Sequence, residues 1–222
     1  MTHVMKSGLT NAGVADVELD DSDLQTGHST GNESSTTVSN PWMFFRRWLA
    51  NPLQMGSIIP SSPTLCRNVV KQIRRAPGEY VIELGAGTGV VSRAMLNAGI
   101  PPENIYVVEI VPTMAEHLRR VLPGVNVISG DALELPELLP AHVRGNIGTV
   151  ICGIPLVLLP IPLQRRFIDV MEAVAPGRGF LHFSYCVTSP LPYEKHQLSA
   201  KRESWTPKNF PPASVWRYTP QR

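Results

Sequence analysis

The spacing of hydrophobic residues divides the chain into three parts. Residues 1–40 are rich in Ser, Thr, Gly, Asn and Asp and have no apolar period, which predicts a disordered tail. Two helices are expected over 41–51 and 62–75, because their apolar residues recur at helical spacing. After a Pro77-Gly78 turn, short apolar runs alternate with helical stretches. The expected organisation is therefore a tail (1–40), two N-terminal helices (41–76) and a main domain (77–222).

The main domain is predicted to be an α/β fold. Strands are expected at Tyr80–Leu84, Ile105–Glu109, Val125–Ser129, Ile147–Cys152 and Phe180–Tyr185. Helices are expected between them at Gly89–Ala98, Pro112–Val121 and Gln164–Val174. The strands are too apolar to have one solvated face, which indicates a parallel sheet covered on both sides. Two last strands, Arg202–Thr206 and Ser214–Tyr218, have no helix between them and should form an antiparallel hairpin.

Charge is distributed unevenly over the 222 residues. The formal net charge is +2, but residues 1–40 carry one lysine against six acidic residues, so the tail contributes −5 and the remainder +7. A basic body is consistent with an anionic partner, either lipid headgroups or nucleic acid, and equally with solubility alone.

The cysteines and the apolar runs limit the class of protein. Three cysteines, far apart and without a CxxC pair, predict free thiols in a reducing compartment and no metal site. The start of the chain lacks the apolar stretch of a secretory signal. The longest apolar run, Val150–Leu163, contains three prolines and is too short to span a bilayer. We therefore expect a cytoplasmic protein.

A glycine-rich segment carries the strongest chemical signal. Glu83-Leu84-Gly85-Ala86-Gly87-Thr88-Gly89 follows an expected strand and opens an expected helix, where glycines let the backbone approach a ligand closely. The segment lacks the GxGxxG spacing of dinucleotide-binding turns, and Glu83 suits a cationic ligand group better than a pyrophosphate. The alternative is a plain turn between strand and helix.

Two further acidic residues follow expected strands. Glu109 ends the second strand, about 20 residues after the glycines, where a carboxylate can accept both ribose hydroxyls of a nucleoside. Asp131 follows the third strand and can accept from an adenine amino group, with Ala132 and Leu133 against the ring. Ligands of open α/β sheets bind at the carboxyl ends of the strands, which is where these acids are expected.

Residues 79–222 resemble the class I methyltransferases, which have a Rossmann-like fold and use S-adenosyl-L-methionine. The resemblance implies that Glu83 and the glycine loop hold the methionine end, Glu109 the ribose and Asp131 the adenine. The full set of cofactor contacts that it implies is Glu83, Gly85, Ala86, Gly87, Thr88, Gly89, Glu109, Ile110, Asp131, Ala132 and Cys152, with Ser57 and Ile58 from a covering segment.

The resemblance places the acceptor site after the fourth strand. The sequence there is Cys152-Gly153-Ile154-Pro155-Leu156, and amino-methylating relatives use the carbonyls of such a turn to bind the attacking amine. Nucleic-acid adenine methylases have Asn or Asp, two prolines and an aromatic residue at this point, so no nucleic-acid partner is expected. Gly153, Ile154 and Tyr185 are the candidate catalytic residues. Tyr185 would orient the amine or a phosphate, or else is an ordinary half-buried strand tyrosine, and His182 is expected to be structural.

Several segments resemble a narrower family, the bacterial phospholipid N-methyltransferases. They are Phe45-Arg46-Arg47-Trp48, Asn51-Pro52-Leu53, Gly56–Ser62, Gly153–Leu156, His182–Tyr185, Ser189-Pro190, Asn209–Ala213 and Val215–Tyr218. The resemblance implies methylation of phosphatidylethanolamine toward phosphatidylcholine. Related enzymes methylate ornithine lipids. The sequence is also consistent with an rRNA or protein N-methyltransferase, or with an inactive module that only binds S-adenosylmethionine.

The first expected helix supports a lipid partner independently. Its aromatic face lies opposite two arginines, as in helices that lie in a membrane interface. The candidate membrane-binding residues are Trp42, Phe45, Arg46, Arg47 and Trp48. The alternative is that the aromatic residues pack on the domain core. In the first case, the protein is peripherally attached to the inner, anionic face of the membrane.

Overall fold

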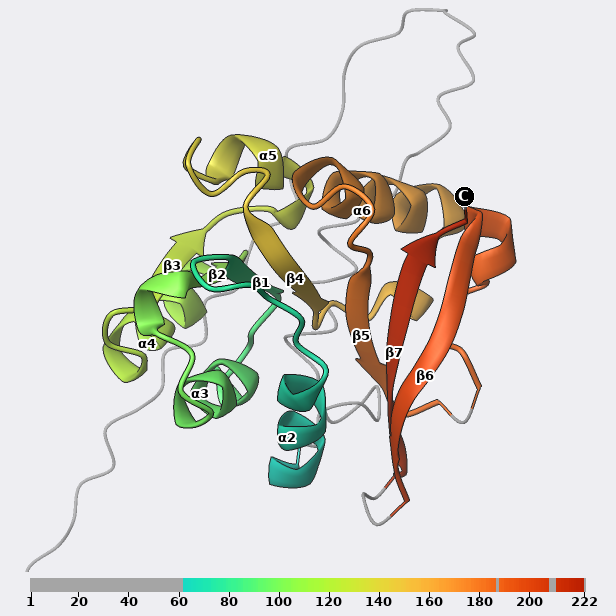
Figure 1. Cartoon of the computed structure of the whole chain (residues 1–222), viewed down its shortest axis with the longest axis horizontal. Coiled ribbons are helices and arrows are strands. Elements are labelled where there is room, and N and C mark those ends of the chain that lie inside the picture. Colours follow the sequence, from blue (N-terminus) through green and yellow to red (C-terminus); the bar gives the residue numbers. More distant parts are fainter. Residues whose placement is uncertain (1–61, 187, 208–210, 222) are drawn as a thin grey trace, which may run out of the picture. The chain divides into compact units, whose positions relative to one another are not determined.

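A seven-stranded sheet organises the protein, and we describe it from a computed structural model. The structure describes residues 62–186, 188–207 and 211–221. The strand order is β3-β2-β1-β4-β5-β7-β6 (Figure 1). The strands are β1 (Tyr80–Leu84), β2 (Ile105–Glu109), β3 (Asn126–Ser129), β4 (Ile147–Cys152), β5 (Phe180–Ser184), β6 (Leu198–Thr206) and β7 (Ala213–Pro220).

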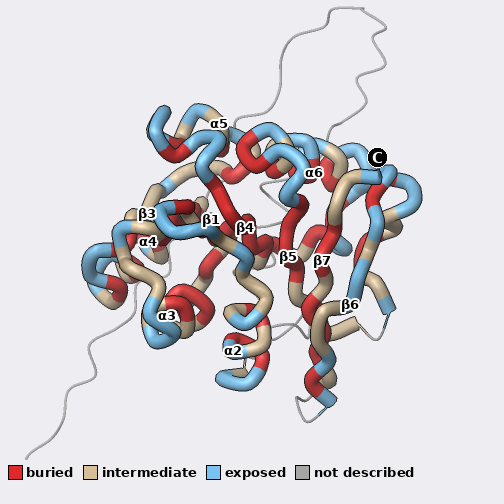
Figure 2. The backbone as a smooth tube through the Cα atoms, in the orientation of Figure 1, coloured by how far each residue is buried: buried red, intermediate tan, exposed pale blue. Residues whose placement is uncertain are grey.

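Strand directions follow the prediction of a mostly parallel sheet. The first five strands pair in parallel, while β7 is antiparallel to both β5 and β6. The C-terminal hairpin thus closes the sheet, as predicted. Figure 2 shows that β4, β5 and β7 are largely buried, whereas β6 at the edge is intermediate or exposed except at its two end residues.

Helices cover both faces of this sheet. They are α2 (Pro63–Lys71), α3 (Val90–Asn97), α4 (Pro112–Val121), α5 (Leu135–Leu138) and α6 (Ile161–Val174), with short 3-10 helices η1 (Pro102–Asn104), η2 (Ala132–Glu134), η3 (Leu156–Leu158) and η4 (Tyr193–His196). Helices α2, α3 and α4 lie on one side of the sheet and α5 and α6 on the other (Figure 1). Residues of the first three helices pack into one apolar cluster, and residues of α5 and α6 into another. Successive residues of a strand point to opposite clusters, so Val81 joins the first and Ile82 the second.

Three elements differ from their predicted limits by three or more residues. Helix α2 ends at Lys71, short of the predicted residue 75, because the backbone of Arg74 is bonded to the Thr149 hydroxyl, with N···O and O···O distances of 2.9 and 2.8 Å. Helix α6 begins three residues before the predicted Gln164, because prolines are tolerated in a first helical turn. Strand β6 begins at Leu198, four residues early. The predicted helix over 41–51 and residues 56–61 lie outside the described residues.

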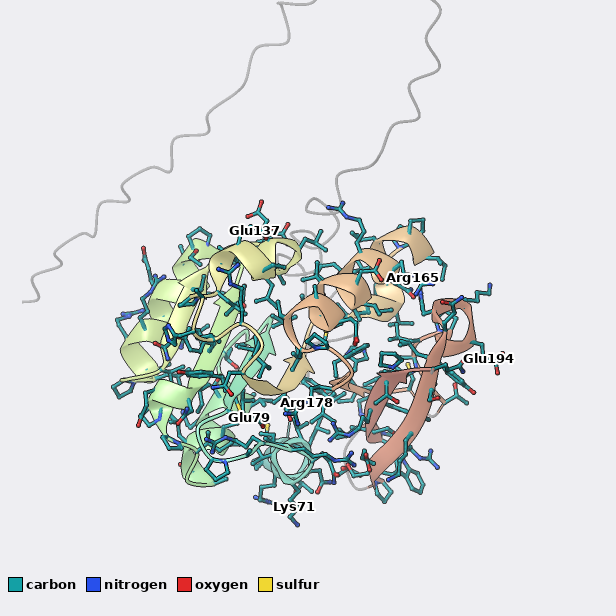
Figure 3. All side chains as sticks on the ribbon, turned by 45° about the horizontal axis from the view of Figure 1, so that its top comes forward. Lys71, Glu79, Glu137, Arg165, Arg178 and Glu194 are labelled. Atoms are coloured by element: carbon teal, nitrogen blue, oxygen red, sulfur yellow. The ribbon has the colours of Figure 1, made fainter. Side chains whose placement is uncertain are left out.

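Ionic contacts lie before β1 and on the C-terminal hairpin. Arg178 pairs with Glu79, just before β1, and Glu79 also accepts from the Ala76 N–H at 2.6 Å (Figure 3). On the hairpin, the largely covered side chains of Glu203 and Arg217 pair at 3.0 Å, while Arg217 also donates to a carbonyl after α2. No helix in the described ranges is long and apolar enough to cross a membrane.

Candidate cofactor and acceptor site

The glycine loop connects β1 to α3 through three left-handed residues. Gly85, Gly87 and Gly89 have φ values of 72, 56 and 75°, which favour glycine. A methyl group on Gly89 would lie 2.7 Å from Cδ2 of Leu118, and one on Gly85 would lie 3.0 Å from Cγ1 of Ile154. A methyl group on Gly87 would meet no atom within 4 Å, so this glycine faces open space. The outer glycines thus serve packing, and the middle one leaves room for a ligand.

Glu109 lies directly beside this loop, as the sequence predicted. Its carboxylate accepts from the N–H groups of Gly87 and Val111, each at 3.1 Å, and the residue is buried. Burial raises the pKa of Glu109 above its ordinary value, against the opposing effect of these N–H donors. Each oxygen retains a lone pair, so the carboxylate can still accept two hydroxyl groups.

Glu83 lies beneath the loop. Its carboxyl is buried and bonded to the hydroxyl of Ser92, on the first turn of α3. Burial raises the pKa of Glu83 to about 7, and the nearby Glu109 charge acts in the same direction. Glu83 does not line the pocket that the described residues form, so a direct contact with the methionine end stays a prediction.

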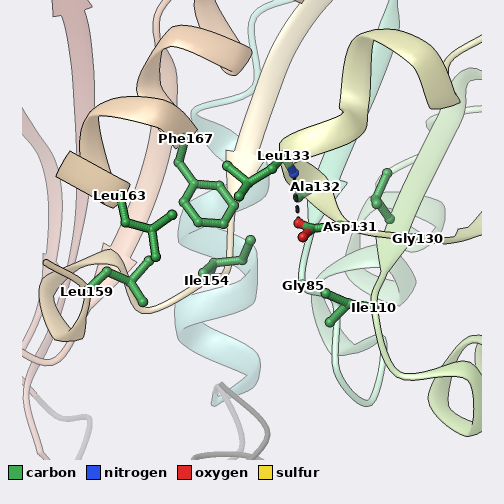
Figure 4. Close-up of a pocket in the computed structure, with 11 residues that line it drawn as sticks. Gly85, Ile110, Gly130, Asp131, Ala132, Leu133, Ile154, Leu159, Leu163 and Phe167 are labelled. Carbon is green, nitrogen blue, oxygen red and sulfur yellow. Dashed lines mark hydrogen bonds between the residues drawn. The ribbon is translucent and has the colours of Figure 1, made fainter. Parts of the chain in front are cut away.

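A pocket opens beside the loop at the carboxyl ends of the strands (Figure 4). Gly85, Ile110 and Asp131 lie on one side of it, and Ile154 lies between them and a wall formed by α6 and by a residue two positions before that helix. The wall consists of Leu159, Leu163 and Phe167. Asp131 accepts from the Leu133 N–H at 2.9 Å through one oxygen, which leaves its other oxygen unbonded within the described part of the chain.

The composition of the pocket tests which group it fits. Its walls are apolar, its charged group is a carboxylate, and the described lining residues include no Lys or Arg. A pyrophosphate would find no cation there, whereas an adenine ring would find apolar walls and an acceptor for its amino group. Together with the open space at Gly87 and the unused lone pairs of the Glu109 carboxylate beside it, the residues fit the adenosyl part of S-adenosylmethionine.

The turn after β4 packs tightly on the glycine loop. Gly153 donates its N–H to the Leu84 carbonyl at 2.8 Å, and a methyl group on Gly153 would lie 2.7 Å from the Gly85 carbonyl oxygen. The carbonyls of Cys152 and Ile154 already accept, from His182 Nδ1 and the Leu156 N–H, both at 2.8 Å. Within the described residues the Gly153 carbonyl accepts no such bond. It is therefore the turn's available acceptor.

Comparisons with known proteins agree with this geometry. No protein-family profile matches the chain. It is similar to an ornithine lipid N-methyltransferase of Singulisphaera acidiphila, with 27% identity over 181 residues that cover 79% of this chain and 93% of the relative. The chain is an S-adenosylmethionine-dependent methyltransferase with a Rossmann-like fold.

Other relatives share only part of their length with this methyltransferase. A protein-L-isoaspartate O-methyltransferase of Aeropyrum pernix is 32% identical over 98 residues, and a ribosomal RNA small subunit methyltransferase A of Prosthecochloris aestuarii is 34% identical over 99. These matches cover 41% and 42% of this chain and 37% of each relative. The chain thus spans about a third of these two relatives.

Solved structures support the fold. A TehB-like SAM-dependent methyltransferase from Corynebacterium glutamicum superposes with a TM-score of 0.51 at 12% identity, over 82% of this chain and all of that one. TrmN from Thermus thermophilus superposes with a TM-score of 0.54 at 14% identity, over 78% of this chain and 53% of the TrmN chain.

Three other residues that the sequence analysis considered for the site do not line the pocket. His182 is buried, burial lowers its pKa to about 4, and it is bonded to Cys152, which confirms a structural histidine. The Cys152 thiol is also buried, burial raises its pKa to about 12, and it does not line the pocket. Tyr185 packs on the apolar cluster formed by α2 and α3. The structure therefore does not bring Tyr185 to the pocket, and its orienting role stays a prediction.

Some residues of the site were not predicted, and others are not described. Leu159, Leu163 and Phe167 recur at four-residue spacing, which the sequence cannot distinguish from an ordinary core-facing helix. Ser92 gave no signal either, because it lies within a helix rather than in the loop. The predicted cover residues Ser57 and Ile58, and the predicted membrane-binding residues from Trp42 to Trp48, lie outside the described residues.

Proposed function

We propose that this methyltransferase adds methyl groups to the amine of a membrane lipid, with phosphatidylethanolamine as the first candidate. The observation that carries the proposal is the similarity to a lipid N-methyltransferase over almost its whole length, 93%. The matches to isoaspartate and rRNA enzymes stop at 37% of those proteins. The narrower phospholipid N-methyltransferase resemblance of the sequence supports the same class of substrate.

The described residues suggest how the cofactor is held. Glu109 accepts the ribose hydroxyls, Asp131 accepts from the adenine amino group, and Ala132, Ile154 and Phe167 pack on the ring. S-adenosylmethionine, when bound, supplies a methyl group already activated by its sulfonium. The protein therefore has mainly to position the two reactants, which can lower the barrier by about 7–11 kcal/mol.

The acceptor turn suggests how the amine is received. The Gly153 carbonyl accepts one N–H of the amine and fixes its direction toward the loop. The lipid amine must lose a proton before it attacks, and an apolar surrounding favours its neutral form. Asp131 is the only titratable residue among the described pocket-lining residues, and it lies at the proposed adenine end. Desolvation therefore takes the place of a dedicated base in this proposal.

Ornithine lipid is the second candidate substrate. The relative that carries the proposal is itself named for this lipid. Both lipids present a primary amine at the headgroup, so the Gly153 carbonyl suits either. Discrimination between them then depends on the rest of the headgroup.

Labelled methyl transfer tests the proposal. The purified protein is incubated with methyl-labelled S-adenosylmethionine and, in separate reactions, with vesicles of phosphatidylethanolamine, vesicles of ornithine lipid, rRNA, or a protein extract. We expect label in a lipid that migrates as a methylated amine on thin-layer chromatography. Label confined to rRNA or protein would contradict the lipid assignment.

Membrane attachment is a separate part of the proposal and has its own test. The predicted helix over 41–51, with Arg46 and Arg47 opposite its aromatic residues, would bind the anionic inner face of the cytoplasmic membrane. Sedimentation with anionic vesicles should recover the protein in the pellet, and neutral vesicles should recover less. A protein that stays in the supernatant with both would contradict attachment.

A further inference from the structure

Exposed apolar side chains are concentrated next to the pocket. Among the described residues, the exposed large hydrophobic residues are Val157, Leu158, Ile161 and Trp205, with exposed fractions of 44, 38, 41 and 52%. The first three lie within five residues of the chain, immediately after the acceptor turn. We call Val157, Leu158 and Ile161 the apolar lip. Grouped apolar exposure of this kind marks a contact surface, whereas single exposed residues are ordinary.

The lip and the pocket wall belong to one segment. Leu159 and Leu163 alternate with the lip residues along the chain and face the pocket instead of solvent (Figure 4). The lip therefore continues the apolar wall of the pocket out to the protein surface. A molecule whose polar end reached the pocket would have its apolar part beside the lip.

Hydrogen bonds hold the lip in its exposed position. The Leu158 N–H donates to the Pro155 carbonyl at 3.0 Å. The side-chain amide of Gln164 donates to the Leu159 carbonyl at 2.9 Å, and its oxygen is bonded to His196 Nε2 at 2.8 Å. Since the backbone is fixed on both sides, the lip cannot turn inward without breaking these bonds.

The charges around the lip indicate the kind of surface it meets. The sequence contains no Asp or Glu between Glu137 and Asp169. Arg165 and Arg166 follow the lip on α6, and Arg166 is exposed. Apolar side chains followed by arginines complement a lipid layer, where acyl chains lie beneath anionic headgroups.

We infer that the apolar lip contacts the acyl chains of the lipid whose amine enters the pocket. The inference rests on the proposed function and extends it, because it makes the acyl chains part of what the enzyme recognises. Removing acyl area from water supplies binding free energy that a small soluble amine cannot supply. The enzyme should therefore prefer long-chain lipid over the same headgroup on short chains.

The test compares two substrates and two variants. Leu158→Asp combined with Ile161→Asp places two negative charges on the lip, and the control Ala173→Asp places one negative charge on an exposed position near the far end of α6. Methyl transfer is measured on vesicles of long-chain phosphatidylethanolamine or ornithine lipid, whichever the wild type uses, and on a soluble short-chain form of that lipid. We expect the double variant to lose at least tenfold in kcat/KM on vesicles and to stay within about twofold of wild type on the soluble form. The Ala173→Asp protein should match wild type on both.

Each remaining outcome has one meaning. Wild-type-like activity of the double variant on vesicles would contradict a contact between the apolar lip and the acyl chains. Equal losses of activity on both substrates, with cofactor binding unchanged by calorimetry, would contradict it as well. If the aspartates prevent folding, Leu158→Ser with Ile161→Ser replaces them and must show the same selective loss. A wild-type protein inactive on both lipids in either form would instead contradict the proposed function itself.

Discussion

At the scale of single residues, Glu109 is the side chain on which cofactor binding should depend most. Its carboxylate accepts from Gly87 in the glycine loop and from Val111, the second residue after β2, and each of its oxygens keeps an unused lone pair. Glu109→Gln keeps the size of the side chain but removes its charge and one acceptor oxygen. Because hydrogen bonds to charged groups contribute about 1.5–3 kcal/mol, we expect cofactor affinity to fall at least about tenfold. Calorimetric titration that finds unchanged affinity would remove Glu109 from the site.

The raised pKa of Glu83 predicts that the stability of the fold depends on pH. Its folded pKa of about 7 lies above its ordinary value of 4.5, so the folded state holds the proton more strongly than the unfolded state. Stability from this group is present at acid pH and is lost as pH rises from about 4.5 to 7. Over that pH range the free energy of unfolding of the wild type should fall by up to about 3 kcal/mol relative to that of Glu83→Gln.

Urea unfolding of both proteins at pH 5 and pH 8 measures this change. The advantage of wild type over Glu83→Gln should be smaller at pH 8 than at pH 5. Ser92→Ala is the matched control, because it removes the bond that lowers the pKa of Glu83 and should therefore increase the pH dependence. An identical difference between wild type and Glu83→Gln at both pH values would contradict a buried, protonated Glu83.

At the scale of elements, the hairpin depends on one buried ion pair. The side chains of Glu203 and Arg217 are each 6% exposed, and Arg217 also donates to the backbone after α2. Glu203→Ala would leave a buried guanidinium without its carboxylate, which costs about 3–5 kcal/mol. Lys201→Ala removes a second ion pair to the same carboxylate, but the side chain of that lysine is 71% exposed. We therefore expect the free energy of unfolding to fall by less than about 1 kcal/mol. Equal losses for the two variants in urea unfolding would contradict this account of the hairpin.

The elements also show what the sequence could and could not predict. β1, β2 and β4 were predicted at their observed bounds, because continuous apolar runs that end at Gly or polar residues specify buried strands. The start of α6 was missed because its prolines resemble a loop, and α5 was missed because it has only four residues. The start of β6 was missed because an edge strand is partly solvated and lacks a continuous apolar signal.

The site was predictable to the extent that it lies at strand ends. Glu109 and Asp131 could be placed at strand ends, because Glu109 ends one apolar run, Asp131 closely follows another, and parallel strands bring their carboxyl ends to one edge. Their contacts with the cofactor stay predictions. The pocket wall from Leu159 to Phe167 was not found, because burial against a ligand and burial in the core use the same side chains. Which carbonyl of the acceptor turn stays available also depended on backbone bonds that no sequence pattern contains.

At the scale of the whole molecule, the acceptor turn and the apolar lip lie beside the same pocket. The Gly153 carbonyl, the apolar lip and the apolar wall of the pocket lie in one segment, from the end of β4 into α6, so a lipid could pass its headgroup inward while its chains stay outside. An enzyme of soluble amines would need no such exposed apolar edge beside its acceptor turn.

The most direct measurement is methyl transfer from labelled S-adenosylmethionine to lipid vesicles, with rRNA and protein offered in parallel. Our account predicts label in methylated phosphatidylethanolamine, or in methylated ornithine lipid as the second candidate, and a loss of that label in Glu109→Gln. Active enzyme that labels rRNA or protein while both lipids stay unlabelled would contradict it.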